Sequence, residues 1–170
     1  STDLRGQVVW ITGGARGLGR ALALGFAKEG ADIAFSYYRS RHEAETTETD
    51  LHAIGARCLA VESDLRRVEQ ILDAQSRIDD ELGRIDVLIN NAGVFVRTPF
   101  GVMTEDQIDD VIGFNLKATL FAGQEVANRM KSREGGSIIN ISSVGGLVPW
   151  SGYTGYCASK AAVIMATRTM

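Results

Sequence analysis

The chain has 170 residues, enough for one domain with a single buried core, and its 45% hydrophobic and 23% charged content is typical of a globular protein. Its net charge of -3 leaves no surplus of cations to neutralise the phosphates of a nucleic acid. No apolar run is long enough to cross a bilayer, and the polar residues 1–7 contain no signal-peptide core, so we expect a cytoplasmic protein that binds neither nucleic acid nor membrane.

Short apolar segments rich in β-branched residues alternate along the chain with longer segments of helical periodicity. The short segments predict strands at 8–11, 33–35, 58–61, 87–89 and 138–141. The long segments predict helices at 18–29, 41–54, 66–82 and 105–131, because their apolar residues recur near i, i+3, i+4 and i+7. Since the strands are almost wholly apolar rather than alternating, we predict a doubly wound α/β fold with a parallel sheet, in a single domain over residues 1–170.

A glycine-rich loop directly follows the first predicted strand and opens the first predicted helix. Glycines there let the backbone turn tightly and approach a pyrophosphate, and the helix N-terminus supplies free N–H groups and a partial positive charge. The loop predicts a dinucleotide site, although such turns also serve packing alone and occur in methyltransferases and flavin proteins. Its candidate cofactor-binding residues are Thr12, Gly13, Arg16, Gly17, Leu18 and Gly19.

The end of the second predicted strand indicates which dinucleotide is preferred. NAD-binding folds place an Asp or Glu here, about 20 residues after the loop, on the adenosine ribose. This chain has no acid in residues 36–41 but has Tyr37, Arg39 and Arg41. With Arg16 in the loop, these arginines would face a 2′-phosphate, so we predict NADP(H) over NAD(H); one of Arg39 and Arg41 is expected to be only a solvated helix start.

The predicted helix 105–131 begins with a capping-box signal, Thr104 with Gln107. Asn115 lies inside this helix, although Asn is a poor helix former that competes for backbone hydrogen bonds. This misfit indicates a functional role for Asn115.

Tyr156 and Lys160 lie one helical turn apart, after the serines at 142 and 143. Side chains at i and i+4 share one helix face, and a nearby ammonium favours the phenolate over the phenol. The pair is therefore suited to proton transfer near neutral pH, although the same spacing occurs in ordinary amphipathic helices. A methyltransferase would have no use for it.

The predicted helix that starts near Tyr156 reaches Met170 without the Gly, Asn or Pro that usually ends a helix. A crossover helix in a parallel sheet leads to another strand, and without one the strand 138–141 would be an exposed apolar edge. We expect either that a partner covers this edge or that the chain is part of a longer protein. Cys58 and Cys157 have no metal-ligand or CxxC spacing, so we expect no metal and two reduced thiols, with Cys58 in the core.

Together these motifs resemble the classical short-chain dehydrogenase/reductase family over nearly the whole chain. The resemblance rests on the glycine-rich loop 12–19 and on Asp64, Asn90 to Gly93, Asn115, Ser143, Tyr156 and Lys160. It implies a Rossmann-like fold, here truncated at its C-terminal end, and an oxidoreductase that transfers hydride between NADP(H) and a carbonyl or alcohol. Because the family's C-terminal strands are absent, a non-catalytic, dinucleotide-binding or partner-dependent module is the alternative.

The resemblance also implies roles for individual residues. Asp64, with its neighbour Leu65, would contact the adenine, and Asn91, Ala92 and Gly93 would lie beneath the adenosine and the nicotinamide ribose; a helix N-cap and a plain turn are the structural alternatives.

In the family's mechanism Tyr156 would be the general acid or base, and Ser143 would polarise the carbonyl. Lys160 would hold the nicotinamide ribose and favour the Tyr156 phenolate, and Asn115 would hold a water that connects Lys160 to solvent. Ser143 is preferred to Ser142 because it lies thirteen residues before Tyr156, the family's spacing.

The substrate pocket is implied less sharply. Its apolar and aromatic candidates also suit ordinary packing; they are Val94, Phe95, Leu147, Trp150 and Tyr153. They would accept an apolar ketone, a hydroxy compound or an acyl thioester. A homodimer or homotetramer is implied, formed through the helices that begin at Glu105 and near Tyr156.

Overall fold

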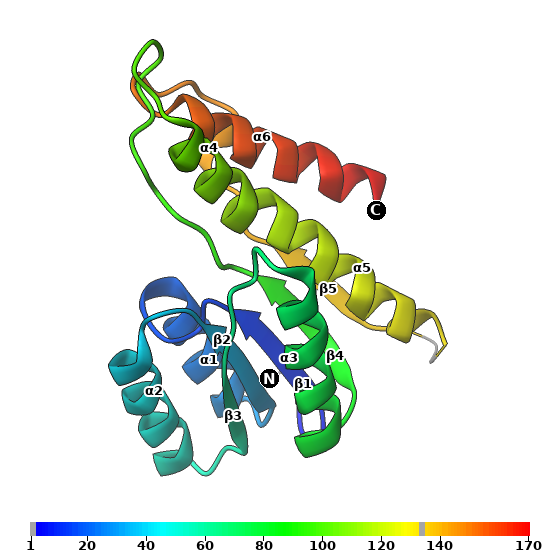
Figure 1. The fold of residues 1–170 in the computed structure, drawn as a ribbon. Coiled ribbons are helices and arrows are strands. Elements are labelled where there is room, and N and C mark those ends of the chain that lie inside the picture. Colours follow the sequence, from blue (N-terminus) through cyan, green and yellow to red (C-terminus); the bar gives the residue numbers. More distant parts are fainter. Residues whose placement is uncertain (1–2, 133–134) are drawn as a thin grey trace.

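The computed structural model describes residues 3–132 and 135–170; Ser1 and Thr2, part of the polar start, lie outside the described residues. Figure 1 shows a sheet with helices on both faces. The strands are β1 (Val8–Thr12), β2 (Asp32–Tyr37), β3 (Cys58–Glu62), β4 (Ile85–Asn90) and β5 (Ser137–Asn140). The α-helices are α1 (Gly17–Lys28), α2 (Arg41–Ala53), α3 (Val68–Glu81), α4 (Glu105–Ile112), α5 (Ala118–Lys131) and α6 (Thr154–Thr169). A π-helical turn, η1 (Gly113–Lys117), and a 3-10 turn, η2 (Val144–Gly146), complete the described elements.

The strands pair in parallel in the order β3-β2-β1-β4-β5, which confirms the predicted parallel sheet. β1 lies at the centre and is buried along its whole length, which explains its unbroken apolar sequence. From β1 the chain first winds outward to β3 and then crosses to β4 on the other side. The carboxyl ends of β1 and β4 therefore form a topological switch point, where ligands bind in folds of this class.

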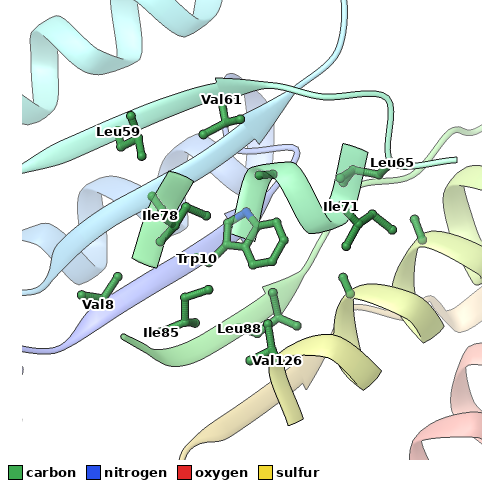
Figure 2. Close-up of a cluster of buried hydrophobic side chains, with 14 of the residues drawn as sticks. Val8, Trp10, Leu59, Val61, Leu65, Ile71, Ile78, Ile85, Leu88 and Val126 are labelled. Carbon is green, nitrogen blue, oxygen red and sulfur yellow. The ribbon is translucent and has the colours of Figure 1, made fainter. Parts of the chain in front are cut away.

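Two apolar layers hold the helices to the sheet. On one face α3 and α5 pack on Trp10, Leu88 and their neighbours; Figure 2 shows the Trp10 ring among side chains of α3 and of the strands. On the other face α1 and α2 pack on Phe35, Ile33 and Ile11. The doubly wound architecture is therefore confirmed, with each central strand covered on both sides.

The predicted helix 105–131 is helical along its whole length but contains a π-helical turn. Its capping box is confirmed, because Thr104 Oγ1 accepts from the Gln107 amide and the Gln107 side chain accepts from the Thr104 amide. The helix is then interrupted by η1, whose five residues include Asn115. A π turn contains one extra residue, which changes the direction of the side chains around it. Such turns are frequent at functional sites. The misfit of Asn115 therefore marks an irregular, π-helical turn within the helix.

β5 is at the edge of the described sheet, as expected, and pairs with β4 alone. Ile139 on this strand is 43% exposed. Both cysteines are free, but Cys58 is only partly buried rather than fully in the core, and burial raises the pKa of its thiol to about 11. In the described ranges no helix combines the length and apolar character needed to span a bilayer.

Candidate active site

The loop after β1 is tied to the turn after β4 by buried hydrogen bonds. Thr12 Oγ1 accepts from the amides of Asn91 and Ala92, both at 2.9 Å. In return, the Asn91 side-chain amide donates to the carbonyls of Thr12 and Gly13, at 3.0 and 3.1 Å. The sequence predicted that Thr12 and Asn91 belong to the cofactor site. In the structure their hydrogen bonds join the loop after β1 to the turn after β4 at the switch point.

The glycines of this loop make room for a ligand and for the start of α1. Gly13 and Gly17 have positive φ values of 69° and 55°, where a side chain would be strained. A Cβ at Gly19 would collide with the Gly13 carbonyl oxygen and lie 2.7 Å from Asn91 Nδ2. α1 begins directly after Arg16, whose side chain does not cap the helix. The first amide groups of α1, which have no partner within the helix, therefore point to the space above the loop.

That space is a cavity of about 530 Å³ that runs from the glycine-rich loop past the end of β2 to the turn after β4. Most of the predicted cofactor residues line it: Gly13, Arg16, Gly17, Leu18, Gly19, Tyr37, Arg39, Leu65, Asn91, Ala92 and Gly93. Val94 also lines it. Sequence reasoning missed Ser36, Ser40 and Ser63, and the ring pair Tyr38–Phe114, whose centroids are 5.8 Å apart. Phe114 is carried there by η1, which no periodicity could indicate.

The two arginines after β2 have different surroundings. Arg41 forms an exposed ion pair with Glu62 and does not line the cavity. Arg39 lines the cavity, with its guanidinium 4.7 Å from the centre of the Tyr38 ring, and no carboxylate in the described ranges pairs with it. Its φ of 61° is the only positive value among the described residues other than glycine, and this conformation sets the direction of its side chain.

Asp64 is buried, but its carboxylate is already held by Arg66. The guanidinium donates to both carboxylate oxygens, at 2.9 and 2.7 Å, and this hydrogen bonding lowers the pKa of Asp64. Arg66 also pairs with Asp110 and lies 4.6 Å from the centre of the Phe114 ring. Asp64 is not among the residues that line the cavity, whereas Leu65 is. Its role toward an adenine stays a prediction.

Lys160 is buried at the inner end of the site. Its Nζ donates to the carbonyl of Ile141 at 2.9 Å, just beyond β5. Gly93 lies close by, since a Cβ there would be 3.7 Å from Nζ and 2.9 Å from Asn115 Oδ1. Desolvation by burial lowers the pKa of Lys160 from its ordinary value. The Lys160 ammonium therefore lies behind Gly93, in the turn after β4 that lines the cavity. There, a hydroxyl of a bound ligand would replace the Ile141 carbonyl as its hydrogen-bond partner.

The lowered pKa of Lys160 predicts a pH dependence of stability. Below the ordinary lysine value of 10.5, the unfolded chain binds more protons than the folded chain, so this residue makes the free energy of unfolding rise with pH in that window. The free energy of unfolding of wild type minus that of Lys160→Met, measured by urea denaturation, should therefore increase as the pH rises toward 10.5. Lys131→Met, at the exposed end of α5, controls for the loss of one positive charge. A difference that stays constant would contradict the lowered pKa.

The two serines after β5 have distinct partners. Ser142 Oγ donates to the Lys160 carbonyl at 2.8 Å and so fastens α6 to the sheet. Ser143 Oγ accepts from the Gly145 amide at 3.1 Å as the cap of η2, which leaves its own proton available. A Cβ at Gly145 would lie 3.3 Å from the Tyr156 ring, so η2 packs directly beside this phenol. Ser143 is therefore the better placed of the two serines to act on a ligand.

Asn115 is buried and its side-chain amide is fully engaged. Oδ1 accepts from the Val94 amide at 2.7 Å, and Nδ2 donates to the Val94 carbonyl at 3.1 Å and to Ser159 Oγ at 3.0 Å. Ser159 Oγ in turn donates to the carbonyl of Tyr156 at 2.7 Å. Asn115 thus connects the segment after the Asn-Asn-Ala-Gly turn with α6.

Tyr156 is half-buried within a group of four rings. Phe95 and Tyr153 stack with centroids 4.5 Å apart, Phe95 meets Tyr156 edge to face at 4.7 Å, and the Trp150 ring lies nearly parallel to Tyr156 at 6.1 Å. The Tyr156 hydroxyl makes no hydrogen bond to any other described residue and is free to meet a ligand. Of the predicted pocket residues, Phe95, Leu147 and Trp150 remain exposed, at 58%, 73% and 36%.

The residues predicted to be catalytic thus lie where the turn after β4, η2 and α6 meet; none of them lines the cavity itself, which reaches Gly93 and Val94 of that turn. At one end of the site the glycine-rich loop suits the phosphates of a cofactor that carries hydride. At the other end a phenol, a hydroxyl and an ammonium are available for proton transfer. Such an arrangement suits redox chemistry at a carbonyl or alcohol carbon.

Comparison with known proteins agrees with this geometry. The chain is 34% identical over 159 residues to a 3-oxoacyl-(acyl-carrier-protein) reductase of Staphylococcus epidermidis, covering 94% of this chain. It is 38% identical over 167 residues to galactitol 2-dehydrogenase of Agrobacterium fabrum, covering 98% of this chain. It spans 65% and 64% of these two relatives, less than two thirds of either.

A solved short-chain dehydrogenase/reductase of Serratia marcescens superposes with a TM-score of 0.94 at 33% identity, covering 99% of this chain and 68% of that one. The family model for short chain dehydrogenases matches residues 7–170. The chain therefore belongs to the short-chain dehydrogenase/reductase family, whose members are oxidoreductases that bind a nicotinamide dinucleotide.

Proposed function

We propose that this chain is the cofactor-binding and catalytic part of an NADP(H)-dependent oxidoreductase that interconverts a carbonyl compound and an alcohol. One observation carries the proposal: Lys160 lies beside Gly93, which lines the cavity that begins at the glycine-rich loop, and on the same helix Tyr156 packs against η2, which Ser143 caps. A role limited to binding a dinucleotide would need the loop but none of these three side chains.

The residues present fit a dinucleotide. A Cβ at Gly17 would point into open space, the start of α1 offers unpartnered amides, and the cavity extends from this cradle to Gly93 and Val94, beside Lys160. When bound there, a nicotinamide supplies or accepts the hydride. The protein's part is to bind, to orient, and to move one proton.

Each catalytic side chain has a role that its surroundings support. In reduction, Tyr156 would donate the proton to the carbonyl oxygen and in oxidation it would accept it, since its hydroxyl is uncommitted. Ser143 would donate a hydrogen bond to the same oxygen, where negative charge develops. Lys160 would hold ribose hydroxyls and, by its charge, favour the phenolate.

Asn115 is best described as a positioning residue in this proposal. Its side-chain amide already binds Val94 and Ser159, so a water-holding role would fall to its backbone carbonyl, which accepts from Thr119 Oγ1 at 3.1 Å and has a second lone pair. The π turn around it supplies the irregular backbone that such a role needs.

The preference for NADP(H) is supported by the free guanidinium of Arg39 and by Arg16 on the same cavity. Replacing Arg39 with Ala should raise the dissociation constant of NADPH about tenfold or more, because hydrogen bonds to charged groups are each worth about 1.5–3 kcal/mol. The dissociation constant of NADH should change less than about threefold, since NADH lacks the 2′-phosphate. Fluorescence titration with both cofactors measures this.

Arg41→Ala is the matched control, because Arg41 is paired with Glu62 and lies off the cavity lining. It should alter neither dissociation constant by more than about threefold. Equal losses of NADPH and NADH affinity in Arg39→Ala, or tighter binding of NADH by the wild type, would refute the NADP(H) assignment.

For the substrate we propose a small apolar ketone, hydroxy compound or acyl thioester. The support is the exposed apolar character of Phe95, Leu147, Val148 and Trp150 beside Tyr156. A kcat/KM series of ketones graded in apolar size tests this: no rise with apolar size would contradict it.

We also propose that the enzyme is cytoplasmic and a homodimer or homotetramer. Partly exposed apolar side chains on α5 and α6, such as Leu120 and Met165 at 36% and 58%, support an interface between copies. Light scattering that gives a monomer mass at micromolar concentration would contradict the oligomer.

A further inference from the structure

Helix α6 carries both Tyr156 and Lys160, yet it starts without a cap of its own. Its N-cap residue is Tyr153, whose side chain makes no capping hydrogen bond. The first amides of any helix lack partners within the helix and need an acceptor from elsewhere. Tyr156 is the third residue of α6, so the ordering of this first turn sets where the phenol stands.

The missing acceptor comes from Thr98, far away in sequence. Thr98 is fully buried, and its Oγ1 accepts from the Gly155 amide at 2.8 Å, across 57 positions of chain. Gly155 is the second residue of α6, one of the positions that an N-cap side chain serves. Thr98 thus caps α6 from the segment that connects β4 to α4.

The backbone on both sides is shaped for this contact. The Thr98 amide donates to the Gly152 carbonyl at 2.8 Å, and Thr98 forms a parallel β-bridge with Tyr153. Pro99 restricts the residue before it to extended conformations, which suits the bridge. Gly152 has a φ of 80°, a left-handed conformation that glycine adopts without strain.

The first turn of α6 is also packed too closely to shift without consequence. A Cβ at Gly155 would lie 2.9 Å from Ile108 Cδ1 and 3.2 Å from Thr98 Oγ1. Phe95, three residues before Thr98, makes the edge-to-face contact with the Tyr156 ring at 4.7 Å. One short segment therefore both caps the helix and contacts the phenol that the helix presents.

We infer that Thr98 is a positioning residue for Tyr156, acting through the first turn of α6. The inference rests on the proposed function, because it assigns Thr98 to the same proton transfer. Loss of the Thr98 hydroxyl leaves the Gly155 amide without its acceptor and frees the helix start to move. Displacements of about 1 Å at a reacting group can reduce turnover about a hundredfold.

The test compares three variants of the protein: Thr98→Val, Thr98→Ser and Thr104→Val. Val keeps the shape of Thr without the hydroxyl, and Ser restores the hydroxyl. Thr104→Val is the control, because it removes an equivalent helix cap, from the Gln107 amide, on α4 rather than α6. Hydrogen exchange of the Gly155 amide, kcat, KM and the dissociation constant of NADPH are measured for each.

We expect Thr98→Val to speed exchange at Gly155 and to lower kcat about tenfold or more, with the NADPH dissociation constant unchanged within about threefold. Thr98→Ser should restore most of the slow exchange at Gly155 and most of kcat. Thr104→Val should lower the melting temperature without lowering kcat. Unchanged exchange at Gly155, unchanged kcat despite faster exchange, or an equal fall of kcat in Thr104→Val would each overturn the inference. If Tyr156→Phe itself retained turnover, the proposed function would fail, while the exchange measurement would still decide the cap.

Discussion

Replacing Tyr156 with Phe is expected to lower kcat at least about a hundredfold, the scale of one general acid-base group. The substitution removes only the hydroxyl, and this hydroxyl makes no hydrogen bond to the described residues around it. The ring contacts with Phe95 and Trp150 are kept, so the fold around the site should not change. The measurement is steady-state reduction of a ketone with NADPH.

Two properties of the same variant serve as its controls. The melting temperature should stay within a few degrees of wild type, and the dissociation constant of NADPH should change less than about threefold. Because neither depends on proton donation, a fall in kcat alone assigns the hydroxyl to the chemical step. Near-normal turnover in Tyr156→Phe would remove the proposed mechanism.

Replacing Gly19 with Ala is expected to abolish measurable cofactor binding, with a loss of at least about a hundredfold in affinity. The new Cβ would strike the Gly13 carbonyl oxygen, which belongs to the backbone and cannot rotate away. On its other side is Asn91 Nδ2, at 2.7 Å, which is held by hydrogen bonds to the carbonyls of Thr12 and Gly13. The loop must therefore move, and with it the amides at the start of α1. NADPH titration and thermal melting both measure the result.

Gly25→Ala is the matched control on the same helix. A Cβ at Gly25 meets nothing within 4 Å, so alanine should fit without strain. Since alanine is favoured over glycine in a helix interior by about 0.5–1 kcal/mol, this variant should be slightly more stable than wild type and bind NADPH equally well. If Gly19→Ala and Gly25→Ala behaved alike, the steric account of the loop would be wrong.

The sequence predicted correctly those features of the fold that depend on residues close together in the chain. The strands could be predicted because both faces of a central parallel strand are buried, which leaves an unbroken apolar run such as 8–11. The capping box at Thr104 could be predicted because its two hydrogen bonds join residues three positions apart. The glycine-rich loop could be recognised because its backbone conformations and close contacts need glycine at fixed spacing.

Where interacting residues lie far apart in the chain, the sequence pattern gave no prediction or an incomplete one. The predicted helix 105–131 contains the π turn η1, within which the Asn115 side chain bonds to Val94 and Ser159. Arg66 did not stand out, although it holds Asp64 and Asp110 and packs against Phe114. These contacts follow from which strand and helix ends the fold brings together, and no periodicity encodes them.

The sequence by itself therefore determined the family and the order of strands and helices, and it indicated the loop, the serine, the tyrosine and the lysine as candidates, because each motif depends on residues close together in the chain. Only the tertiary structure decided that Ser142 fastens α6 while Ser143 caps η2, that Arg39 rather than Arg41 lines the cavity, and that Thr98 caps α6. Ser142, Arg41 and Thr98 are distinguished by partners that lie 18, 21 and 57 positions away in the chain. Those partners are supplied by the packing of the parallel sheet and its helices.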